Sequence, residues 1–334
     1  MTVDSRLARV SVTRAFERPT VVVSRCLEFE PVRWDGQMIS EPLVRELKQH
    51  VDFIPVCPEM EIGLGVPRKP VRIVDTGSGR RLIQLETELD LTEKMSDFAR
   101  TFLSSLKDVD GFLLKSRSPS SGIKDVKIYP GPGKVAASGR GAGFFGGAVL
   151  EMFPTLAVED EGRLKDFDIR EAFLTRIFAH ADLRRVIRSG RMKELVAFHA
   201  RNKHLLMAYN QKEMRLLGRI VANTAKASFA DAVSEYEEHF NLALARKPRK
   251  SSVINVLMHA LGYFKDDLSP REKSDFLNLL GTYREGRLPL IALLTLIKSW
   301  ALRYDISYIL EQTMFQPFPE DLVSMRDSGK SVEG

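Results

Sequence analysis

Three segments of the chain place reactive side chains directly after a short apolar run. Cys26 ends the run PTVVVSRC, Cys57 and Glu59 lie in FIPVCPE, and the serine-rich stretch KSRSPSSG follows GFLL. Cysteines act as nucleophiles and metal ligands in their thiolate form, and a positioned glutamate can accept or donate a proton. Serine hydroxyls and free backbone N–H groups at the end of a strand can face a ligand. These three segments are therefore the candidates for a functional site.

The elements that must position these segments are predicted to be alternating strands and helices. The short apolar runs, typical of buried parallel strands, cover residues 19–26, 53–59 and 111–114. A helix is expected from Ser40, which could cap it ahead of Pro42, and another over residues 92–106. This alternation predicts a doubly wound, Rossmann-like α/β domain. Ligands bind outside the carboxyl ends of the strands in such sheets, so the three segments should meet in one composite site.

The chain has only two cysteines, Cys26 and Cys57. In a reducing compartment they are not expected to form a structural disulfide. Two thiolates alone also fail to complete a zinc site or an iron–sulfur site. Their positions after two strands therefore carry more information than their number.

Two further stretches have both a functional and a structural interpretation. The glycine-rich run over residues 138–153 could present backbone N–H groups at a helix start to an anion, or its glycines could allow tight helix packing. It matches neither a dinucleotide-binding fingerprint nor a P-loop. Asp35 in RWDG could belong to the site or could close a β-turn before Gly36. A charged stretch over residues 71–85 is expected to form a hairpin.

The second half of the chain is predicted to be an all-α bundle. Apolar residues recur at helical spacing from about Asp168, and Ser269, Pro270 and Glu272 form a good helix start. Residues 1–160 contain 22 basic and 22 acidic side chains, and residues 161–334 contain 28 and 22, so the net charge of +6 lies in the second half. This excess suits an anionic partner such as nucleic acid, although an ordinary solvated surface has the same appearance.

Length and hydropathy restrict the class of protein. A chain of 334 residues favours two domains, and the longest apolar run, LPLIALLTLI, is about half of the ~20 residues that a membrane span needs. The first residues carry arginines but lack the apolar core of a secretory signal. A cytoplasmic protein without a membrane partner is expected.

Longer motifs around these residues resemble a known family. SRCLEFEPVRWDGQ, VCPEMEIGLGVPR and KSRSPSSGIKDVKIY resemble the thiouracil desulfidase (TudS-type) family, and FHARNKHLLMAYNQKEMRLLGRIVAN with MFQPFPEDL resembles the YbgA-type domain of unknown function. The resemblance covers roughly residues 18–322. It implies a desulfidase domain over residues 18–160, a connecting segment over 161–187, a helical domain over 188–322, and flexible tails over 1–17 and 323–334.

The desulfidase resemblance implies a [4Fe-4S] cluster held by three cysteine thiolates. Cys26 and Cys57 match two ligand positions, but the family pattern SPSCG reads SPSSG here, so the third position is Ser121. A serine hydroxyl is less acidic than a thiol and is a harder donor, which makes it a poor iron ligand at neutral pH. The cluster is therefore expected to be absent or incomplete in this chain.

The same resemblance implies roles for other residues. Glu59 matches the catalytic carboxylate that activates water, and Ser118 matches the active-site serine. The residues expected to bind substrate are Asp35, Arg140, Gly141 and Gly143. The expected substrate is a thiolated pyrimidine base, nucleoside or nucleotide, and the helical domain should add a basic wall from residues 184–191.

Two hypotheses from different classes follow. The chain is either a non-redox desulfidase for thiolated uracil compounds, impaired at Ser121, or a cluster-free module that binds RNA or nucleotides without catalysis. In both, the basic helical domain could contact RNA, and salt-sensitive RNA binding without turnover would favour the second hypothesis.

Overall fold

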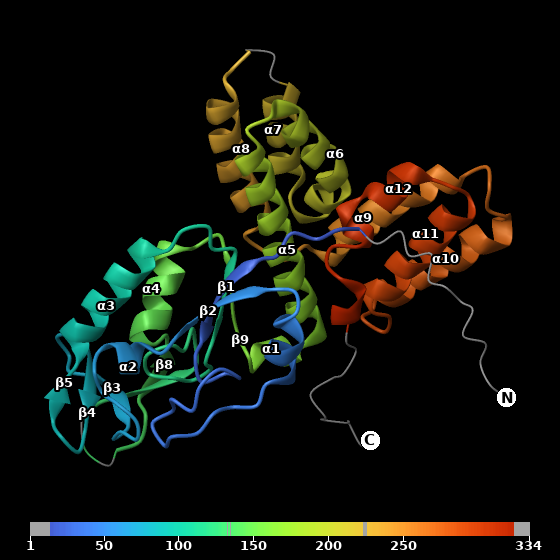
Figure 1. The fold of residues 1–334 in the computed structure, drawn as a ribbon. Helices are drawn as coiled ribbons and strands as arrows, with labels where there is room; N and C mark the ends of the chain where they lie inside the picture. The colour runs from blue at the N-terminus through green and yellow to red at the C-terminus, as the bar shows by residue number, and fades with distance from the viewer. Residues whose placement is uncertain (1–13, 132, 134, 223–225, 324–334) are drawn as a thin grey trace, which may run out of the picture.

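The computed structural model describes residues 14–131, 133, 135–222 and 226–323. It has the predicted fold class, an α/β N-terminal half followed by a helical C-terminal half (Figure 1). Most of the predicted flexible tails lies outside the described residues. Of the part that is described, Phe16 packs edge-on against Phe178, with ring centroids 5.7 Å apart.

The first sheet of the N-terminal half is wholly parallel. Its strands are β1 (Thr20–Ser24), β2 (Asp52–Val56), β6 (Gly111–Leu114) and β9 (Ala157–Asp160), in the order β2-β1-β6-β9. Val22 of β1 lies opposite both Ile54 of β2 and Phe112 of β6. The predicted runs at residues 19–26, 53–59 and 111–114 thus form three adjacent strands, whose carboxyl ends share one edge.

Helices cover both faces of this sheet because successive strand residues point to opposite sides. Val21 and Val23 belong to the core on the face covered by α1 (Pro42–Leu47) and α5 (Phe167–Ser189). Val22 belongs to the core on the other face, beneath α3 (Thr92–Ser105) and α4 (Phe144–Met152). This is the doubly wound arrangement. Figure 1 shows α3 and α4 side by side, away from α1 and α5.

The start of α1 differs from the prediction. The helix begins at Pro42, and its N-cap is Glu41, whose side chain makes no capping hydrogen bond. Ser40, the predicted cap, instead accepts a hydrogen bond at its hydroxyl from Arg45 Nη2, at 2.8 Å. The guanidinium of Arg45 also donates to Glu28, so a local charged group replaces the expected cap.

A second sheet of mixed direction lies beside the first. Its strands are β3 (Val71–Asp75), β4 (Arg80–Gln84), β5 (Leu89–Asp90), β7 (Val126–Tyr129) and β8 (Gly139–Gly141), in the order β5-β4-β3-β7-β8. β3 and β4 are antiparallel, which confirms the predicted hairpin over residues 71–85. The short helix α2 (Pro58–Glu61) directly follows Cys57.

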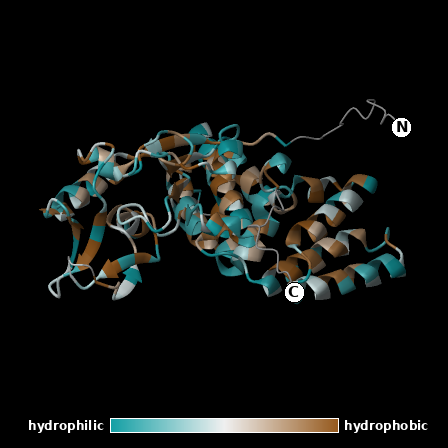
Figure 2. Ribbon diagram, turned by 90° about the horizontal axis from the view of Figure 1, so that it is seen from below, coloured by the Kyte–Doolittle hydropathy of each residue, from teal (hydrophilic) through white to brown (hydrophobic). Residues whose placement is uncertain are grey.

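The C-terminal half consists of helices, of which α6 and α8 pack on the long helix α5. The helices after α5 are α6 (Met192–Tyr209), α7 (Gln211–Ala222), α8 (Phe229–Leu244), α9 (Lys250–Leu261), α10 (Pro270–Arg284), α11 (Leu290–Arg303) and α12 (Ser307–Glu311). Figure 2 shows that they carry both hydrophilic and hydrophobic residues, as helices with one buried face do. The predicted start of α10 is confirmed, because Ser269 and Glu272 form a capping box. No described helix is both long and apolar enough to cross a membrane.

Most of the segment predicted as a connection, residues 161–187, lies within α5. The N-terminal part of α5 packs on the parallel sheet through Phe173, Leu174 and Ile177, and its C-terminal part reaches the helical core through Leu183 and Val186. One helix is therefore shared by both halves.

Candidate functional site

The carboxyl edge of the parallel sheet contains a cavity of about 350 Å³. It brings together the candidate side chains of the three predicted segments, which are Cys26, Cys57, Glu59, Ser118 and Ser121. They follow β1, β2 and β6, which are neighbours in the sheet. The topology that placed these segments at one edge therefore also places them around one cavity.

The two cysteines are free thiols within this cavity. Burial and the neighbouring Cys57 raise the pKa of the Cys26 thiol to about 12. Burial also raises the pKa of Cys57, although the nearby guanidinium of Arg68 opposes this effect. Cys57 Sγ lies 3.8 Å from Arg68 Nη2 and from the carbonyl oxygen of Val32. Both side chains are thus thiols at neutral pH unless a cation stabilises the thiolate.

Glu59 is fixed at both of its carboxylate oxygens. Arg68 Nε donates to Oε2 at 2.7 Å, and Ser120 Oγ donates to Oε1 at 2.8 Å. Arg68 is itself held by the carbonyl oxygens of Val32 and Gly65, both at 3.0 Å. The Glu59 and Arg68 side chains are only 11% and 4% exposed, so this is a buried, oriented ion pair.

A line of hydroxyls connects Glu59 to the serine-rich loop. Ser120 Oγ, which donates to Glu59, lies 2.9 Å from Ser118 Oγ. Ser118 Oγ also accepts from the backbone N–H of Ser121, at 3.1 Å. A proton could therefore pass between Ser118 and Glu59 through Ser120 without a large movement of any side chain.

The glycine-rich run packs against the serine-rich loop and donates hydrogen bonds to it. The N–H groups of Gly143, Phe144 and Gly146, at the start of α4, donate to the carbonyl oxygens of Gly122, Pro119 and Ser120. A Cβ atom on Gly143 would lie 2.5 Å from the Ser120 carbonyl oxygen. The glycines therefore allow the loop and α4 to approach closely, which is the packing interpretation of this run. The Gly143 N–H is engaged by the loop instead of being free for an anionic ligand.

Arg68 and Ser120 are residues that sequence reasoning missed as members of the site. Both lie within the quoted motifs, in GVPR and in SPSSG, and Ser120 is two residues from Ser118. Lys115 and Ser116 also line the cavity, and both bind Glu161, just after β9. Ser116 donates to Glu161 from its hydroxyl at 2.6 Å and from its N–H at 2.7 Å. The ion pair between Lys115 and Glu161 forms because the two residues directly follow β6 and β9, which are neighbours in the sheet. The pairing of these two strands is not indicated by any local sequence pattern.

The other predicted substrate-binding residues lie outside this cavity. Asp35 pairs with Arg33 at 3.5 Å and accepts from the N–H of Gln37, so it stabilises its own turn. Arg140 and Gly141 belong to β8 in the second sheet. Arg140 lines a neighbouring cavity of about 500 Å³ together with Arg117 and Pro119, which also line the cysteine cavity. Substrate binding by these residues stays a prediction.

The expected basic wall from residues 184–191 does not reach the cavity, whose lining comes entirely from the N-terminal half. The arginines are engaged elsewhere by acidic side chains. Arg184 binds Asp110 at 2.6 Å, Arg188 binds Asp108 at 2.9 Å, and Arg191 binds Glu194 at 3.1 Å. Asp108 and Asp110 precede β6, so Arg184 and Arg188 lie at the amino edge of the sheet, at the end of the strands opposite the cavity.

The side chains present do not fit a cluster that needs three thiolates. The third position, Ser121, is 4% exposed and lines the same cavity, but its donor atom is a hydroxyl oxygen. Among the described residues, no three His, Cys, Asp or Glu side chains are grouped so that they could hold a metal ion. Two soft donors and one hard, weakly acidic donor are a poor set for iron–sulfur ligation.

Two families account for most of the chain. Residues 21–161 match the 2-thiouracil desulfurase family, and residues 203–319 match a family of proteins of unknown function, DUF1722. An α/β domain with cysteines and a glutamate at its carboxyl edge, continued by an all-α domain, is the class that fold and site define. The chain belongs to the YbgA-type DUF1722 family through its C-terminal half, and its N-terminal half matches the 2-thiouracil desulfurase family. The N-terminal half is therefore of desulfidase type.

Individual relatives match one half each. The uncharacterized protein YbgA of Escherichia coli (strain K12) is 31% identical over 168 residues, which cover 50% of this chain and 98% of that protein. The uncharacterized protein YbbK of Bacillus subtilis (strain 168) is 28% identical over 138 residues, which cover 37% and 91%. Among solved structures, a [4Fe-4S]-dependent thiouracil desulfidase, TudS, is 26% identical and covers 44% of this chain and 93% of its own, with a TM-score of 0.36.

Proposed function

We propose that the cysteine cavity binds a thiolated uracil compound and that this chain is a C–S bond hydrolysing desulfidase impaired at Ser121. The observation that carries this proposal is the grouping of Cys26, Cys57, Glu59 and Ser121 around one cavity in a domain that matches the desulfurase family. A volume of about 350 Å³ is at the lower end of the range for ligand pockets, which suits a pyrimidine ring.

The overall reaction needs no electron transfer. A thiocarbonyl group and water give a carbonyl group and hydrogen sulfide, so the carbon keeps its oxidation state. The attacking water must lose both of its protons in the course of the reaction, and the departing sulfur must gain two to leave as hydrogen sulfide. The line of Ser118, Ser120 and Glu59 offers a path for these protons, since its members are joined by hydrogen bonds of 2.9 and 2.8 Å. Arg68 keeps the carboxylate in place during the transfer.

The expected cofactor of the family, a [4Fe-4S] cluster, would be held by Cys26 and Cys57 with one ligand too few. We therefore assign this chain little or no intact cluster and low turnover. The same side chains would still enclose the ring of a substrate, because the cavity does not depend on the third thiol for its walls.

A nucleotide substrate is supported by the cavity next to the cysteines. That second cavity is lined by Arg72, Arg117, Lys127 and Arg140, which would favour a phosphate group. Arg117 and Pro119 line both cavities, so a base in one and its phosphate in the other would belong to one molecule. In this proposal Arg140 binds substrate through the phosphate and not through the base.

The alternative function is binding of RNA or nucleotides without catalysis. Ser121 favours it, because the missing thiol removes a ligand that the family chemistry needs. The two functions are distinguished by an anaerobic sulfide-release assay with 4-thiouracil and 4-thiouridine monophosphate. We expect the chain to release little sulfide, Ser121→Cys to release it, and Ser121→Cys with Glu59→Gln to lose ~100-fold in rate while still binding substrate. If Ser121→Cys releases no sulfide from either compound, the binding function takes its place.

The phosphate contact has its own test. In the Ser121→Cys background, Arg140→Ala should raise the KM for 4-thiouridine monophosphate ~10-fold and leave that for 4-thiouracil unchanged. Equal effects on both compounds would show that Arg140 does not contact the phosphate.

A further inference from the structure

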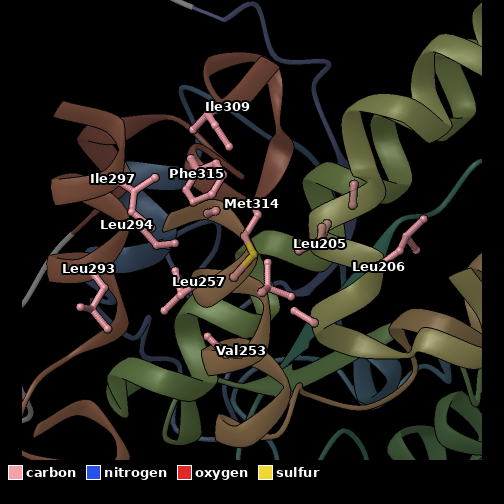
Figure 3. Packing of buried hydrophobic residues seen from close by; sticks show 14 of the residues in the cluster. Leu205, Leu206, Val253, Leu257, Leu293, Leu294, Ile297, Ile309, Met314 and Phe315 are labelled. Carbon is pink, nitrogen blue, oxygen red and sulfur yellow. The ribbon is translucent and has the colours of Figure 1, made fainter. Parts of the chain in front are cut away.

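The helical half contains a cavity of about 750 Å³, larger than the cysteine cavity and sharing no lining residue with it. Its walls come from α5, α6, α9, α10 and α11, the segments before α9 and before α11, and the chain after α12. Figure 3 shows Leu205, Val253 and Leu294 around Met314, each from a different element, and all four line this cavity. A volume of this size lies within the range of small-molecule sites.

One side of the cavity is strongly basic. Lys247, Arg249 and Lys250 reach it from the start of α9, and Arg287 reaches it from the segment before α11. Arg287 pairs with Glu285, but within the described part of the chain Lys247, Arg249 and Lys250 have no carboxylate partner. These three cations, which come from the one segment over residues 247–250, would attract an anionic group.

The helix starts on this side add to the positive potential. α9 and α11 both begin here, and neither Arg249 nor Pro289, their N-cap residues, provides a side-chain cap. Backbone N–H groups of their first turns therefore stay available to an acceptor. Lys250 Nζ lies close to Gly286, because a Cβ atom added to Gly286 would be 3.1 Å from this nitrogen. The start of α9 and the segment before α11 therefore meet at this point.

Another part of the wall is acidic and contains phenols, and one of them, Tyr283, has its ring centroid 5.7 Å from Lys250 Nζ. Asp168 and Glu171 line it from α5, and no hydrogen-bond or ionic partner is found for Glu171 among the described residues. Burial and the neighbouring Asp168 raise the pKa of Glu171 to about 7. Burial and the nearby carboxyl groups of Glu171 and Asp168 raise the pKa of Tyr283 to about 12, so its hydroxyl stays neutral. This wall offers hydrogen-bond donors and acceptors to an uncharged polar group.

We propose that this cavity binds a nucleoside monophosphate, with the phosphate toward Lys247, Arg249 and Lys250 and the polar edge of the base toward Glu171. The apolar walls between the two ends would hold the ring and the sugar. A lipid anion suits the cavity less well, because its apolar chain would have to lie against the carboxyl groups of Asp168 and Glu171. The site is independent of the desulfidase chemistry, since none of its residues lines the cysteine cavity.

Isothermal titration calorimetry of the full chain tests this site with three probes: uridine monophosphate, uridine and inorganic phosphate. We expect the monophosphate to bind more tightly than either part. Lys250→Glu should weaken its binding ~10-fold or more, because it reverses a charge beside the phosphate. Lys193→Glu is the matched control, since Lys193 is also an exposed first-turn residue, of α6, and does not line the cavity. It should change the affinity less than ~2-fold.

Two more variants locate the ligand. Uridine monophosphate also resembles the substrate proposed for the cysteine cavity, which Arg117 lines, so the titrations are repeated in an Arg117→Glu background. That change should remove at most the binding at the cysteine cavity and should leave the binding in the helical half, with its dependence on Lys250, in place. Glu171→Ala should lower the ratio of the affinity for uridine monophosphate to the affinity for inorganic phosphate ~10-fold, because only the nucleotide is long enough to contact Glu171. The proposal would be overturned if uridine monophosphate showed no saturable binding, or if inorganic phosphate bound equally tightly. It would also be overturned if Lys250→Glu and Lys193→Glu weakened the binding of uridine monophosphate equally, or if only Arg117→Glu weakened it.

Discussion

Glu59 is held by a buried guanidinium, that of Arg68, in addition to the hydroxyl of Ser120. Arg68, in the segment that follows α2, binds the Glu59 carboxylate and the backbone carbonyl oxygens of Val32 and Gly65. Both side chains are removed from water, so the loss of either one leaves an unpaired buried charge. Arg68 therefore connects the stability of this edge of the domain to the orientation of its carboxylate.

Arg68→Ala should lower the free energy of unfolding by ~3 kcal/mol or more, as measured by urea denaturation. Arg81→Ala is the control, because Arg81 forms an ion pair with Asp90 in which both side chains are about 45% exposed. That change should cost less than ~1 kcal/mol. Similar losses in the two variants would mean that the Glu59–Arg68 pair is not the buried contact described here.

The main members of the site could be found from the sequence, but their connections could not. Cys26, Cys57, Glu59 and Ser118 each follow a predicted strand, so topology alone groups them. Ser120 and Arg68 make the contacts that hold Glu59, and these depend on how two loops pack across the edge of the sheet. Loop packing of this kind has no periodic signal in the sequence.

Among the elements, the junction between the serine loop and α4 is the most tightly packed part of the site. Gly146 faces the loop, and a Cβ atom there would overlap the Gly122 carbonyl oxygen and lie 2.6 Å from that of Ser121. The adjacent Gly147 faces away, where the nearest atom to a Cβ would be that of Ala142 at 3.7 Å. Two neighbouring glycines of one helix thus have different reasons to be glycine.

Gly146→Ala should destabilise the protein by ~2 kcal/mol, because the loop backbone must move to admit a methyl group. Gly147→Ala should be neutral or should stabilise α4 by up to ~1 kcal/mol, since alanine favours a helix. Thermal unfolding of the two variants checks both values. Equal behaviour of the two would contradict the close packing of the loop on α4.

The elements were predicted with different success for physical reasons. The parallel strands, the hairpin and the capping box at Ser269 have strong local patterns, and the structure confirms them. The predicted cap at Ser40 was wrong, because Arg45 and Glu28 engage that hydroxyl and the adjacent turn. The extent of α5 was missed because its N-terminal part packs on the sheet and its C-terminal part on other helices, which blurs a single apolar stripe.

At the scale of the whole molecule, α5 joins the two halves, and one buried ion pair fixes it to the sheet. Arg184 of α5 binds Asp110, just before β6, at 2.6 Å, and Asp110 also accepts from the N–H of Thr20 in β1. Burial raises the pKa of Asp110 to about 6, against the opposing effect of Arg184. Two of the arginines expected to form a basic wall, Arg184 and Arg188, thus connect α5 to the N-terminal half.

Arg184→Ala should cost ~3 kcal/mol at pH 7, measured by denaturant unfolding, because it leaves a buried carboxylate without its partner. The loss of unfolding free energy should be smaller at pH 4.5, because protonation then removes the charge of Asp110. A carboxyl group whose pKa is raised in the folded state stabilises the fold at low pH, and this effect is lost as the pH rises through about 6. Arg188→Ala, in an exposed pair with Asp108, should cost less than ~1 kcal/mol at either pH. A loss from Arg184→Ala that is larger at pH 4.5 would contradict the role of Asp110.

The central claim for the whole chain is that a desulfidase-type domain lacks its third thiolate at Ser121. The most direct measurement is the iron and acid-labile sulfide content of the chain and of Ser121→Cys after the same anaerobic reconstitution. We expect close to four iron and four sulfide per chain in Ser121→Cys, as a [4Fe-4S] cluster requires, and well under half of that in the Ser121 form. A full cluster in the Ser121 form, or none in Ser121→Cys, would contradict the claim.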